Sequence, residues 1–320
     1  MKFKRAFLAE PGRMEILEIN EEPGDEQVMI KVASCGLCNW ELNHWKGFIT
    51  TGGYPMPLGH EYAGTVVKVG KNVKKFKVGD KVSSLSGRGG FAEYMCCKEA
   101  TTVRLPDDID PKYVLGEPVK CIVTVLDAIA PRIGDYGIII GCGPMGQWCI
   151  QGLAGNLLAG LIAVDINDAK LEMAKKYGAT HTINSKKENV VERLTEITSG
   201  HLADFVVEGT GVHALLNQAL DYLKPTGQGR LIVMSAYESM SPDFDFRKCV
   251  AKSVDIHVAH PGHTQNPMDD MRRACEMIAK GTFNIKELIS HEYKLSEIQT
   301  AMENLEHKPM SYMKGLVYPD

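Results

Sequence analysis

Short apolar stretches with the period of β-strands dominate the first 120 residues of the chain. Segments 27–33, 62–69, 78–83 and 91–96 read as strands, and glycines and prolines separate them. Closely spaced strands with glycine turns are typical of a β-barrel. The pattern therefore predicts a barrel-like β domain in this part of the chain.

After Asp135 the pattern changes, and continuous apolar runs alternate with amphipathic segments such as 168–177 and 186–198. The apolar runs that read as buried strands are 137–140, 161–164, 181–183, 205–207, 231–234 and 256–258. Buried strands that alternate with helices imply a parallel sheet covered on both faces. Six of them fit a doubly wound dinucleotide-binding fold. Two further helices are predicted near 267–280 and 295–306.

Composition narrows the class of protein. A chain of 320 residues exceeds one comfortable core, which predicts two domains. With 36 Lys and Arg against 40 Asp and Glu and no basic block, neither nucleic acid nor an anionic membrane is an expected partner. No signal peptide or membrane span is evident, so a cytoplasmic location is predicted. The nine cysteines are an odd number scattered along the chain, which predicts reduced thiols and no disulfide framework.

A glycine motif follows the first apolar run of the second region. It reads Gly141, Cys142, Gly143, Pro144, Met145, Gly146. The motif G-x-G-x-x-G between a buried strand and a helix predicts a pyrophosphate site at the helix N-terminus. Asp165, which ends the next strand, is placed to bind the adenosine ribose and to repel a 2′-phosphate, which favours NAD. The alternative is a glycine turn of another α/β sheet, with Asp165 as a helix cap.

Potential metal ligands occur in order ahead of this motif. They are the pair Cys35 and Cys38, the sequence Gly59-His60-Glu61, and Glu117. A thiolate, an imidazole and carboxylates are the mixed set that catalytic zinc uses. Each residue alone has an ordinary structural interpretation. A redox dithiol, or a structural zinc held by Cys35, Cys38, Cys96 and Cys97, are further readings of the cysteine pair.

Together these motifs resemble the medium-chain zinc-dependent alcohol dehydrogenase family, and in particular its sorbitol, threonine and sugar dehydrogenase branch. The stretches that carry the resemblance are 35–47, 59–64, 78–82, 90–94, 117–121, 165–170 and 208–211. The resemblance implies an α/β protein with a GroES-like β-barrel catalytic domain and a Rossmann domain with a doubly wound parallel sheet. The corresponding ranges are 1–120 for the catalytic domain, 121–259 for the NAD-binding domain, and 260–320 for the return to the catalytic domain.

The resemblance also implies roles for individual residues. Cys38, His60 and Glu117 fall on the positions that hold zinc. Glu61 is a further ligand or exchanges with substrate and water, and Glu41 orients a ligand. For the cofactor, Lys170 is a second adenosine contact, and Thr210 lies in the turn after the fourth strand of the nucleotide sheet. Because 83–88 runs directly to Gly90, the cysteine-rich lobe of many members is absent and one zinc ion is expected per chain.

The proton route of the family is missing from this chain. Trp40 stands where the family has a hydroxyl residue, and Asn43 stands where it has a relay histidine. Glu61 or Glu117 is then the candidate acceptor of the alcohol proton.

Several aromatic and imidazole side chains are candidates for the substrate pocket. They are Trp40, His44, Trp45, Phe48 and His260, with His257 and His263 nearby. Polar residues among them would suit a hydroxyl-rich substrate. The alternatives are core aromatics in the first group and a solvated loop around His260.

The predicted function is a zinc-dependent oxidoreductase that transfers hydride from a secondary alcohol (a polyol, cyclitol or sugar-like molecule) to NAD. One alternative is a zinc-free quinone or enoyl reductase on the same fold. Another is a non-catalytic NAD-binding protein with a structural zinc. The resemblance further implies a homo-oligomer, either a dimer or a tetramer. Substrate identity and physiological direction stay open.

Overall fold

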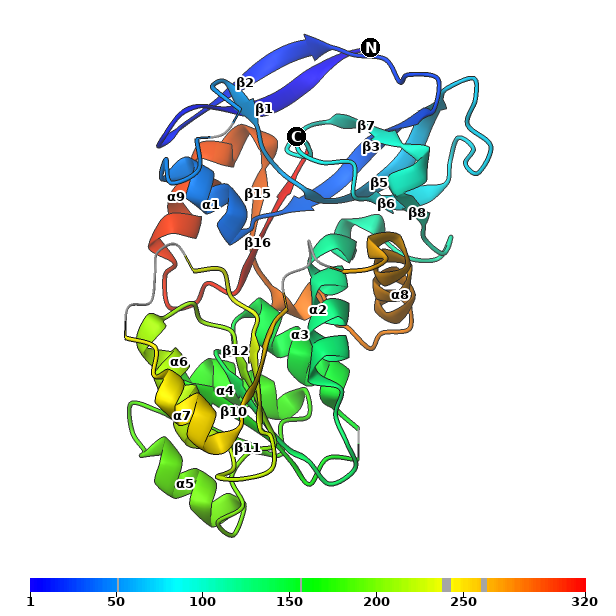
Figure 1. The fold of residues 1–320 in the computed structure, drawn as a ribbon. Helices are drawn as coiled ribbons and strands as arrows, with labels where there is room; N and C mark the ends of the chain where they lie inside the picture. Colours follow the sequence, from blue (N-terminus) through cyan, green and yellow to red (C-terminus); the bar gives the residue numbers. More distant parts are fainter. Residues whose placement is uncertain (51, 156, 238–242, 260–263) are drawn as a thin grey trace. The chain divides into compact units, whose positions relative to one another are not determined.

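The fold is taken from a computed structural model that describes residues 1–50, 52–155, 157–237, 243–259 and 264–320 (Figure 1). The chain forms two compact units. One comprises Met1–Lys120 and Asn266–Asp320, and the other comprises Cys121–Gln265. Among the helices of the described ranges, none combines the length and apolar character that crossing a bilayer requires.

The first unit contains two sheets. A three-stranded sheet has the order β2-β1-β4, and its strands are β1 (Lys2–Glu10), β2 (Arg13–Asn20) and β4 (Met56–Pro57). A larger sheet of seven strands has the order β15-β16-β3-β5-β6-β8, with β7 also paired to β3. These strands are β3 (Gln27–Gly36), β5 (Glu61–Val69), β6 (Lys81–Ser84), β7 (Tyr94–Lys98), β8 (Thr102–Arg104), β15 (Ile289–Lys294) and β16 (Lys314–Tyr318).

Two of these strands begin later than the sequence pattern predicts. The strand predicted over 78–83 is β6, which starts at Lys81 because Gly79 adopts a φ of 95° and Asp80 accepts a hydrogen bond from the backbone of Lys77. The strand predicted over 91–96 is β7, which starts at Tyr94. The hairpin of β1 and β2 was not predicted.

Helices of the first unit connect and cover these strands. They are α1 (Asn39–Trp45), α8 (Pro267–Ala279) and α9 (Ile298–His307), with single 3-10 turns η1 (Glu99–Thr101), η2 (Pro111–Tyr113), η4 (Lys286–Leu288) and η5 (Leu295–Glu297). Helix α2 (Gly116–Ile129) continues into the second unit. The N-terminus of α8 is fixed by Asn266, whose side chain accepts from the backbone of Asp269, and by proline in the first turn.

The second unit is a six-stranded parallel sheet with the order β11-β10-β9-β12-β13-β14. Its strands are β9 (Tyr136–Ile140), β10 (Gly160–Asp165), β11 (His181–Asn184), β12 (Phe205–Glu208), β13 (Arg230–Val233) and β14 (Asp255–Val258). The helices between them are α3 (Pro144–Leu153), α4 (Asp168–Lys176), α5 (Val190–Ile197), α6 (His213–Tyr222) and α7 (Phe246–Lys252). This order is that of a doubly wound dinucleotide-binding fold, so the predicted α/β class and the six predicted strands are confirmed.

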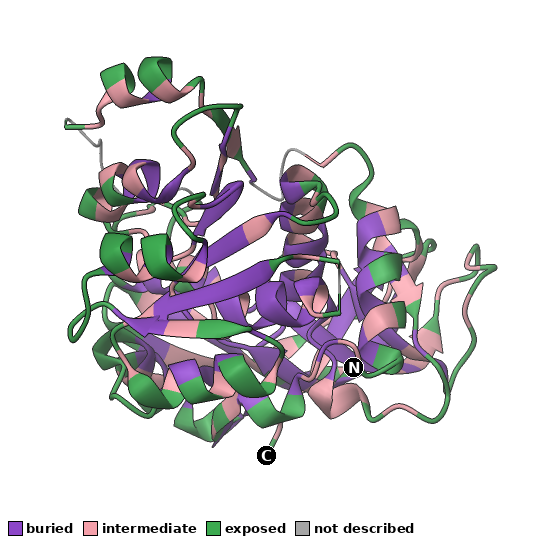
Figure 2. Ribbon diagram, turned by 90° about the horizontal axis from the view of Figure 1, so that it is seen from below, coloured by how far each residue is buried: buried purple, intermediate pink, exposed green. Residues whose placement is uncertain are grey.

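Each unit has its own apolar core. In the second unit, Ile138, Ile162, Val206 and Leu231 lie on adjacent strands and are fully buried. In the first unit, β3 and β5 contribute Val28, Ile30 and Tyr62, and α9 packs against them with Ile298 and Leu305. Figure 2 shows the strands mostly buried and the outer faces of the helices exposed. The continuous apolar runs therefore form strands because both faces of the parallel sheet are covered.

Candidate functional site

The pairing of three strands brings distant parts of the first unit together. Strands β3 and β5 are antiparallel, and Gly36 at the end of β3 lies opposite Glu61 at the start of β5. Strand β16 pairs with the other edge of β3, where Leu316 lies opposite Gly36. The loop that carries Cys38, the residue pair His60-Glu61 and the start of β16 therefore meet at one edge of the sheet, where β3 ends and β5 begins.

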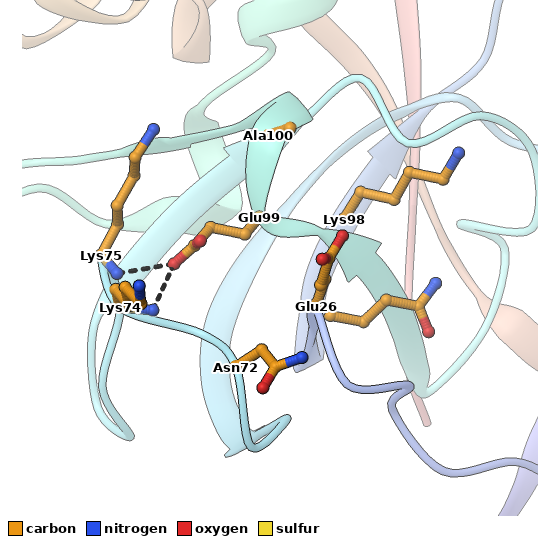
Figure 3. Close-up of a pocket in the computed structure, with 8 residues that line it drawn as sticks. Glu26, Asn72, Lys74, Lys75, Lys98, Glu99 and Ala100 are labelled. Carbon is orange, nitrogen blue, oxygen red and sulfur yellow. Dashed lines mark hydrogen bonds between the residues drawn. The ribbon is translucent and has the colours of Figure 1, made fainter.

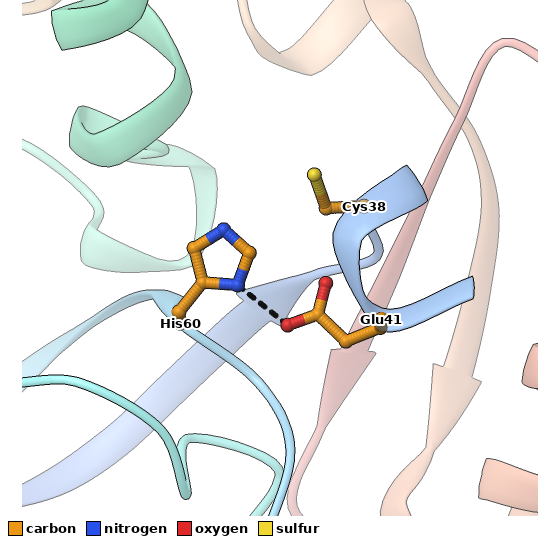
Figure 4. A group of neighbouring side chains, drawn as sticks. All are labelled: Cys38, Glu41 and His60. Carbon is orange, nitrogen blue, oxygen red and sulfur yellow. Dashed lines mark hydrogen bonds and ion pairs between the residues drawn. The ribbon is translucent and has the colours of Figure 1, made fainter. Parts of the chain in front are cut away.

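Cys38, Glu41 and His60 form a compact cluster at this edge (Figure 4). Each offers a potential ligand atom, and these atoms lie within 4.8 Å of one another. His60 Nδ1 lies 2.5 Å from Glu41 Oε1, which also accepts from the backbone N–H of Gly59 at 3.2 Å. Because a carboxylate only accepts, Nδ1 carries the hydrogen and Nε2 is the nitrogen left to bind a metal.

Glu117 lies on the other side of His60. Its Oε2 is 3.7 Å from His60 Nε2, and His60, Glu61 and Glu117 form a second group with ligand atoms within 4.8 Å. The first turn of α2 positions Glu117, and Lys120 in the next turn donates to its Oε1 at 2.9 Å. The four residues that the sequence suggested as metal ligands thus fall into two groups that share His60: Cys38 lies in the first, and Glu61 and Glu117 lie in the second.

Glu61 is held by a buried lysine. Lys314 Nζ lies 2.6 Å from Glu61 Oε2, and it also donates to the carbonyl of Leu37 at 2.9 Å. Burial by itself lowers the pKa of Lys314, but the charges of Glu61 and Cys38 and the hydrogen bond to Glu61 together outweigh it, and the net pKa is raised. A Cβ atom at Gly36 would lie 2.1 Å from Glu61 Oε2, so the residue after Cys35 has to be glycine for this carboxylate to fit.

The donors present fit a divalent cation. One sulfur, one imidazole nitrogen and carboxylate oxygens are a ligand set typical of zinc. Burial would lower the pKa of His60, but the charges and hydrogen bonds of Glu41 and Cys38 raise it well above its ordinary value. Burial and then the charge of Glu61 raise the pKa of the Cys38 thiol. The cluster therefore stabilises positive charge, which a divalent ion would supply.

The alternative of a four-cysteine zinc site is excluded by the strand register. All nine cysteines are free thiols. Cys96 on β7 lies opposite Met29 of β3, which is six residues from Cys35 on the same strand. That separation corresponds to about 20 Å along an extended strand, so these thiols cannot share one ion.

In the second unit the glycine motif connects β9 to α3. A Cβ atom at Gly146 would lie 1.9 Å from the carbonyl oxygen of Gly141, so the helix can approach the strand this closely only with glycine there. Gly143 is the N-cap of α3, and Pro144 starts the helix. The backbone N–H groups of this helix N-terminus form the kind of site that binds phosphate.

Asp165 at the end of β10 faces this turn. Its carboxylate accepts from the backbone N–H groups of Cys142 at 2.7 Å, Ile166 at 2.7 Å and Asn167 at 2.9 Å. The carboxylate is thereby fixed beside the glycine turn. Lys170 lies in the first turns of α4, where Gln147 of α3 donates to its carbonyl at 2.9 Å. Thr210 follows β12 and donates through its backbone to Glu208 at 2.7 Å.

The aromatic candidates separate into exposed and buried residues. Trp40 lies beside the cluster, with its ring centroid 5.3 Å from that of His60 and 4.2 Å from that of His44. Phe48 is 61% exposed. Trp45 belongs to the apolar core and donates to Glu306 of α9 at 2.7 Å, which is the core alternative that the sequence left open.

The imidazole candidates have different environments. His44 is fully buried, and its Nδ1 lies 2.9 Å from the carbonyl of Ile49. His257 lies on β14 beside Asp255. The predictions for His260 and His263 concern residues outside the described ranges.

A separate surface hollow of about 730 Å³ lies at the opposite end of β3 (Figure 3). Its lining includes Gln27 and Lys98, and Glu99 there accepts from the backbone of Lys74 and Lys75. Gln27 starts β3 and Gly36 ends it, a separation of about 30 Å along the strand. The hollow is therefore distinct from the cluster around His60.

Comparison with known proteins agrees with this arrangement. The family model for the alcohol dehydrogenase GroES-like domain matches residues 24–107, and the model for zinc-binding dehydrogenases matches residues 144–280. D-Arabitol-phosphate dehydrogenase of Enterococcus avium is 29% identical over 316 residues, which cover 89% of this chain and 88% of that protein. (R,R)-Butanediol dehydrogenase of Bacillus subtilis (strain 168) is 30% identical over 259 residues, covering 70% and 73%.

Among solved structures, an Escherichia coli oxidoreductase/dehydrogenase of unknown specificity superimposes with a TM-score of 0.90. It is 27% identical, and the alignment covers 100% of both chains. Fold and comparisons thus define a dehydrogenase with a GroES-like unit and a dinucleotide-binding unit. The chain belongs to the zinc-type medium-chain alcohol dehydrogenase family and is an alcohol-type oxidoreductase.

Sequence reasoning did not find three cations near the site. Lys120 stands three residues after Glu117, and that spacing on a helix could have indicated the ion pair. Lys314 and Arg88 gave no such signal, because strand pairing and a loop bring them from distant parts of the chain.

Proposed function

We propose that this protein is a zinc-dependent dehydrogenase that oxidises a secondary hydroxyl of a small polyol or sugar-like molecule with NAD. The observation that carries the proposal is the convergence of Cys38, His60 and Glu117 beside a buried carboxylate, Glu41, that fixes one nitrogen of His60. The polyol class is supported by the relatives, which include a D-arabitol-phosphate dehydrogenase and a sorbitol dehydrogenase at 29% and 27% identity.

Cys38 Sγ, His60 Nε2 and a carboxylate oxygen of Glu117 would hold the ion. When bound, zinc would supply the Lewis acidity that lowers the pKa of a hydroxyl, and NAD would accept hydride from the carbon that carries it. Glu41 keeps His60 in the tautomer that presents Nε2. Lys120 holds Oε1 of Glu117, so that Oε2 faces His60.

Glu117 is the better of the two predicted proton acceptors. Glu61 is 1% exposed and paired with Lys314, whereas 15% of the Glu117 side chain is exposed. Both carboxylates pair with a lysine, Glu117 with Lys120 and Glu61 with Lys314, but only the partly exposed one can pass a proton on to solvent. We therefore assign the acceptor role to the Glu117 carboxylate.

NAD is preferred over NADP in this proposal because of Asp165. Its carboxylate is fixed beside the phosphate-binding turn by three backbone N–H groups, where it would repel a 2′-phosphate.

The function is tested by NADH formation over a panel of polyols, cyclitols, sugars and simple secondary alcohols, with NADP run in parallel. The proposal expects turnover of a secondary alcohol with NAD that a chelator abolishes and added zinc restores. Turnover that survives complete removal of zinc would point to the zinc-free reductase alternative.

We further propose that the protein forms a homo-oligomer through the edge of the parallel sheet. Strand β14 pairs only with β13 in the described part of the chain, and apolar side chains are exposed on it and on α7. They are Phe246, Val250, Ile256 and Val258. Light scattering of the wild type and of Val258→Asp tests this, with a dimer or tetramer expected for the first and a smaller species for the second.

A further inference from the structure

Arg88 lies beside the candidate metal cluster. It belongs to the loop between β6 and β7, and its guanidinium carbon lies 4.6 Å from the ring centroid of Trp40. Since Trp40 is in turn 5.3 Å from the centroid of His60, the two distances limit the separation of Arg88 Cζ from the His60 ring centre to no more than about 10 Å. A fixed positive charge thus lies within reach of a small molecule bound at the cluster.

Arg88 is the half-buried arginine without a carboxylate partner. Four arginines in the described part of the chain are half-buried, and the other three form ion pairs: Arg5 with Glu21, Arg193 with Glu188, and Arg230 with Asp135. Within the described ranges no carboxylate lies in ion-pair distance of Arg88, and its Nη1 points to Met56 Sδ at 3.0 Å. Partial burial of an unpaired cation is costly, so this position is suited to an anion from outside the chain.

An uncharged indole ring lies against Arg88. Trp40 offers the face of its indole, on which a guanidinium stacks and keeps its donor edge in a fixed plane. His44, whose ring lies edge-on to the same indole, has its pKa lowered by burial and by the charge of Arg88. The planar donor fork of arginine is matched to the oxygens of phosphate or carboxylate.

We infer that Arg88, held by Trp40, binds an anionic group of the substrate, several bonds away from the hydroxyl that is oxidised. The substrate class is then a phosphorylated polyol or a sugar acid instead of a neutral polyol. This inference rests on the proposed dehydrogenase function, and it adds a specificity-determining residue to it. Bidentate binding of an anion should contribute about 10- to 100-fold in kcat/KM.

The experiment compares the wild type with Arg88→Gln and Arg88→Lys. Arg13→Gln is the matched control, because Arg13 is exposed on the hairpin of β1 and β2 and pairs with Glu10. Rates with NAD are measured for D-arabitol phosphate, D-arabinonate and free D-arabitol. Binding of inorganic phosphate and of D-arabitol phosphate to the zinc-loaded full chain is measured by calorimetry.

We expect Arg88→Gln to lower kcat/KM for one anionic substrate about 10- to 100-fold and to leave free D-arabitol within about twofold. Arg88→Lys should recover part of this loss. The control Arg13→Gln should show no loss. Whether the loss occurs with D-arabitol phosphate or with D-arabinonate distinguishes a phosphate from a carboxylate as the group that Arg88 binds. The inference would be overturned if Arg88→Gln lowered kcat/KM equally for neutral and anionic substrates, or if its effect were a higher KM for NAD.

Calorimetry separates this inference from the proposed function. If the protein oxidises none of the alcohols but binds phosphate in a manner that Arg88→Gln abolishes, the anion site stands and the dehydrogenase proposal fails. If neutral alcohols are oxidised and no anion binds, the dehydrogenase proposal stands and the anion site is wrong.

Discussion

Glu41 Oε1 lies 2.5 Å from His60 Nδ1, and the Glu41 side chain is fully buried. The imidazole is therefore fixed before any metal arrives, with Nε2 facing Glu117. Preorganisation of this kind raises metal affinity because the ligand does not lose rotational freedom on binding.

Replacing this carboxylate should weaken metal binding. In Glu41→Gln the amide oxygen can still accept from Nδ1, but the charge is lost, and we expect zinc affinity to fall about 10- to 100-fold. Competition with a chromogenic chelator measures it. The control is Glu10→Gln on the surface, where Glu10 pairs with Arg13. Equal affinities for wild type and Glu41→Gln would show that Glu41 is only a structural hydrogen-bond partner.

Zinc affinity should rise with pH. The pKa of His60 and that of Cys38 are both raised in the metal-free site. Because the ordinary pKa of histidine is about 6.5, both side chains still carry their protons at that pH and somewhat above it. Binding then releases up to two protons, and the apparent affinity should rise by as much as about 100-fold per pH unit. Chelator competition at several pH values, with proton release measured in parallel, tests this. An affinity that is flat with pH contradicts the assignment of these two ligands.

The buried pair of Lys314 and Glu61 should be strongly coupled in stability. Lys314→Met leaves the carboxylate buried without its cation, and we expect it to lower the free energy of unfolding by about 3–5 kcal/mol. The double variant Glu61→Gln with Lys314→Met should be more stable than Lys314→Met alone, because no buried charge is left unpaired. Urea denaturation of the two single variants and the double variant completes the cycle. Additive losses would mean that the two side chains do not interact.

Cofactor selectivity should depend on Asp165. In Asp165→Ser the repulsion of a 2′-phosphate is removed, and the ratio of kcat/KM for NADP to that for NAD should rise by about tenfold or more. Asp168→Asn is the control, since Asp168 is exposed and pairs with Lys187. If Asp165 were only a cap of the turn, its replacement would lower stability and leave the cofactor ratio unchanged.

The elements that could be predicted are those with a local signal. The strands of the second unit are continuous apolar runs, and the glycine motif marks the turn from β9 to α3. The candidate ligands Cys38, His60 and Glu117 were identified because their motifs resemble those of a known family. By contrast, β1 and β2 alternate apolar and charged residues weakly, and their pairing with each other and of β1 with β4 defines them.

The partners of the ligands could not be predicted from local sequence. Lys314 reaches Glu61 because β16 pairs with β3, and this register depends on contacts between segments almost 280 residues apart. Arg88 meets Trp40 only through the fold of the loop after β6. Such contacts are set by tertiary packing, which a pattern within one segment does not contain.

The central claim is that Cys38, His60 and Glu117 hold one catalytic ion, and the visible absorption of the cobalt-substituted protein tests it most directly. We predict one cobalt ion per chain with a single thiolate-to-metal band that Cys38→Ser removes, while Cys35→Ser, Cys96→Ser and Cys97→Ser keep it. A spectrum of several thiolates, or a band that persists in Cys38→Ser, would contradict the account.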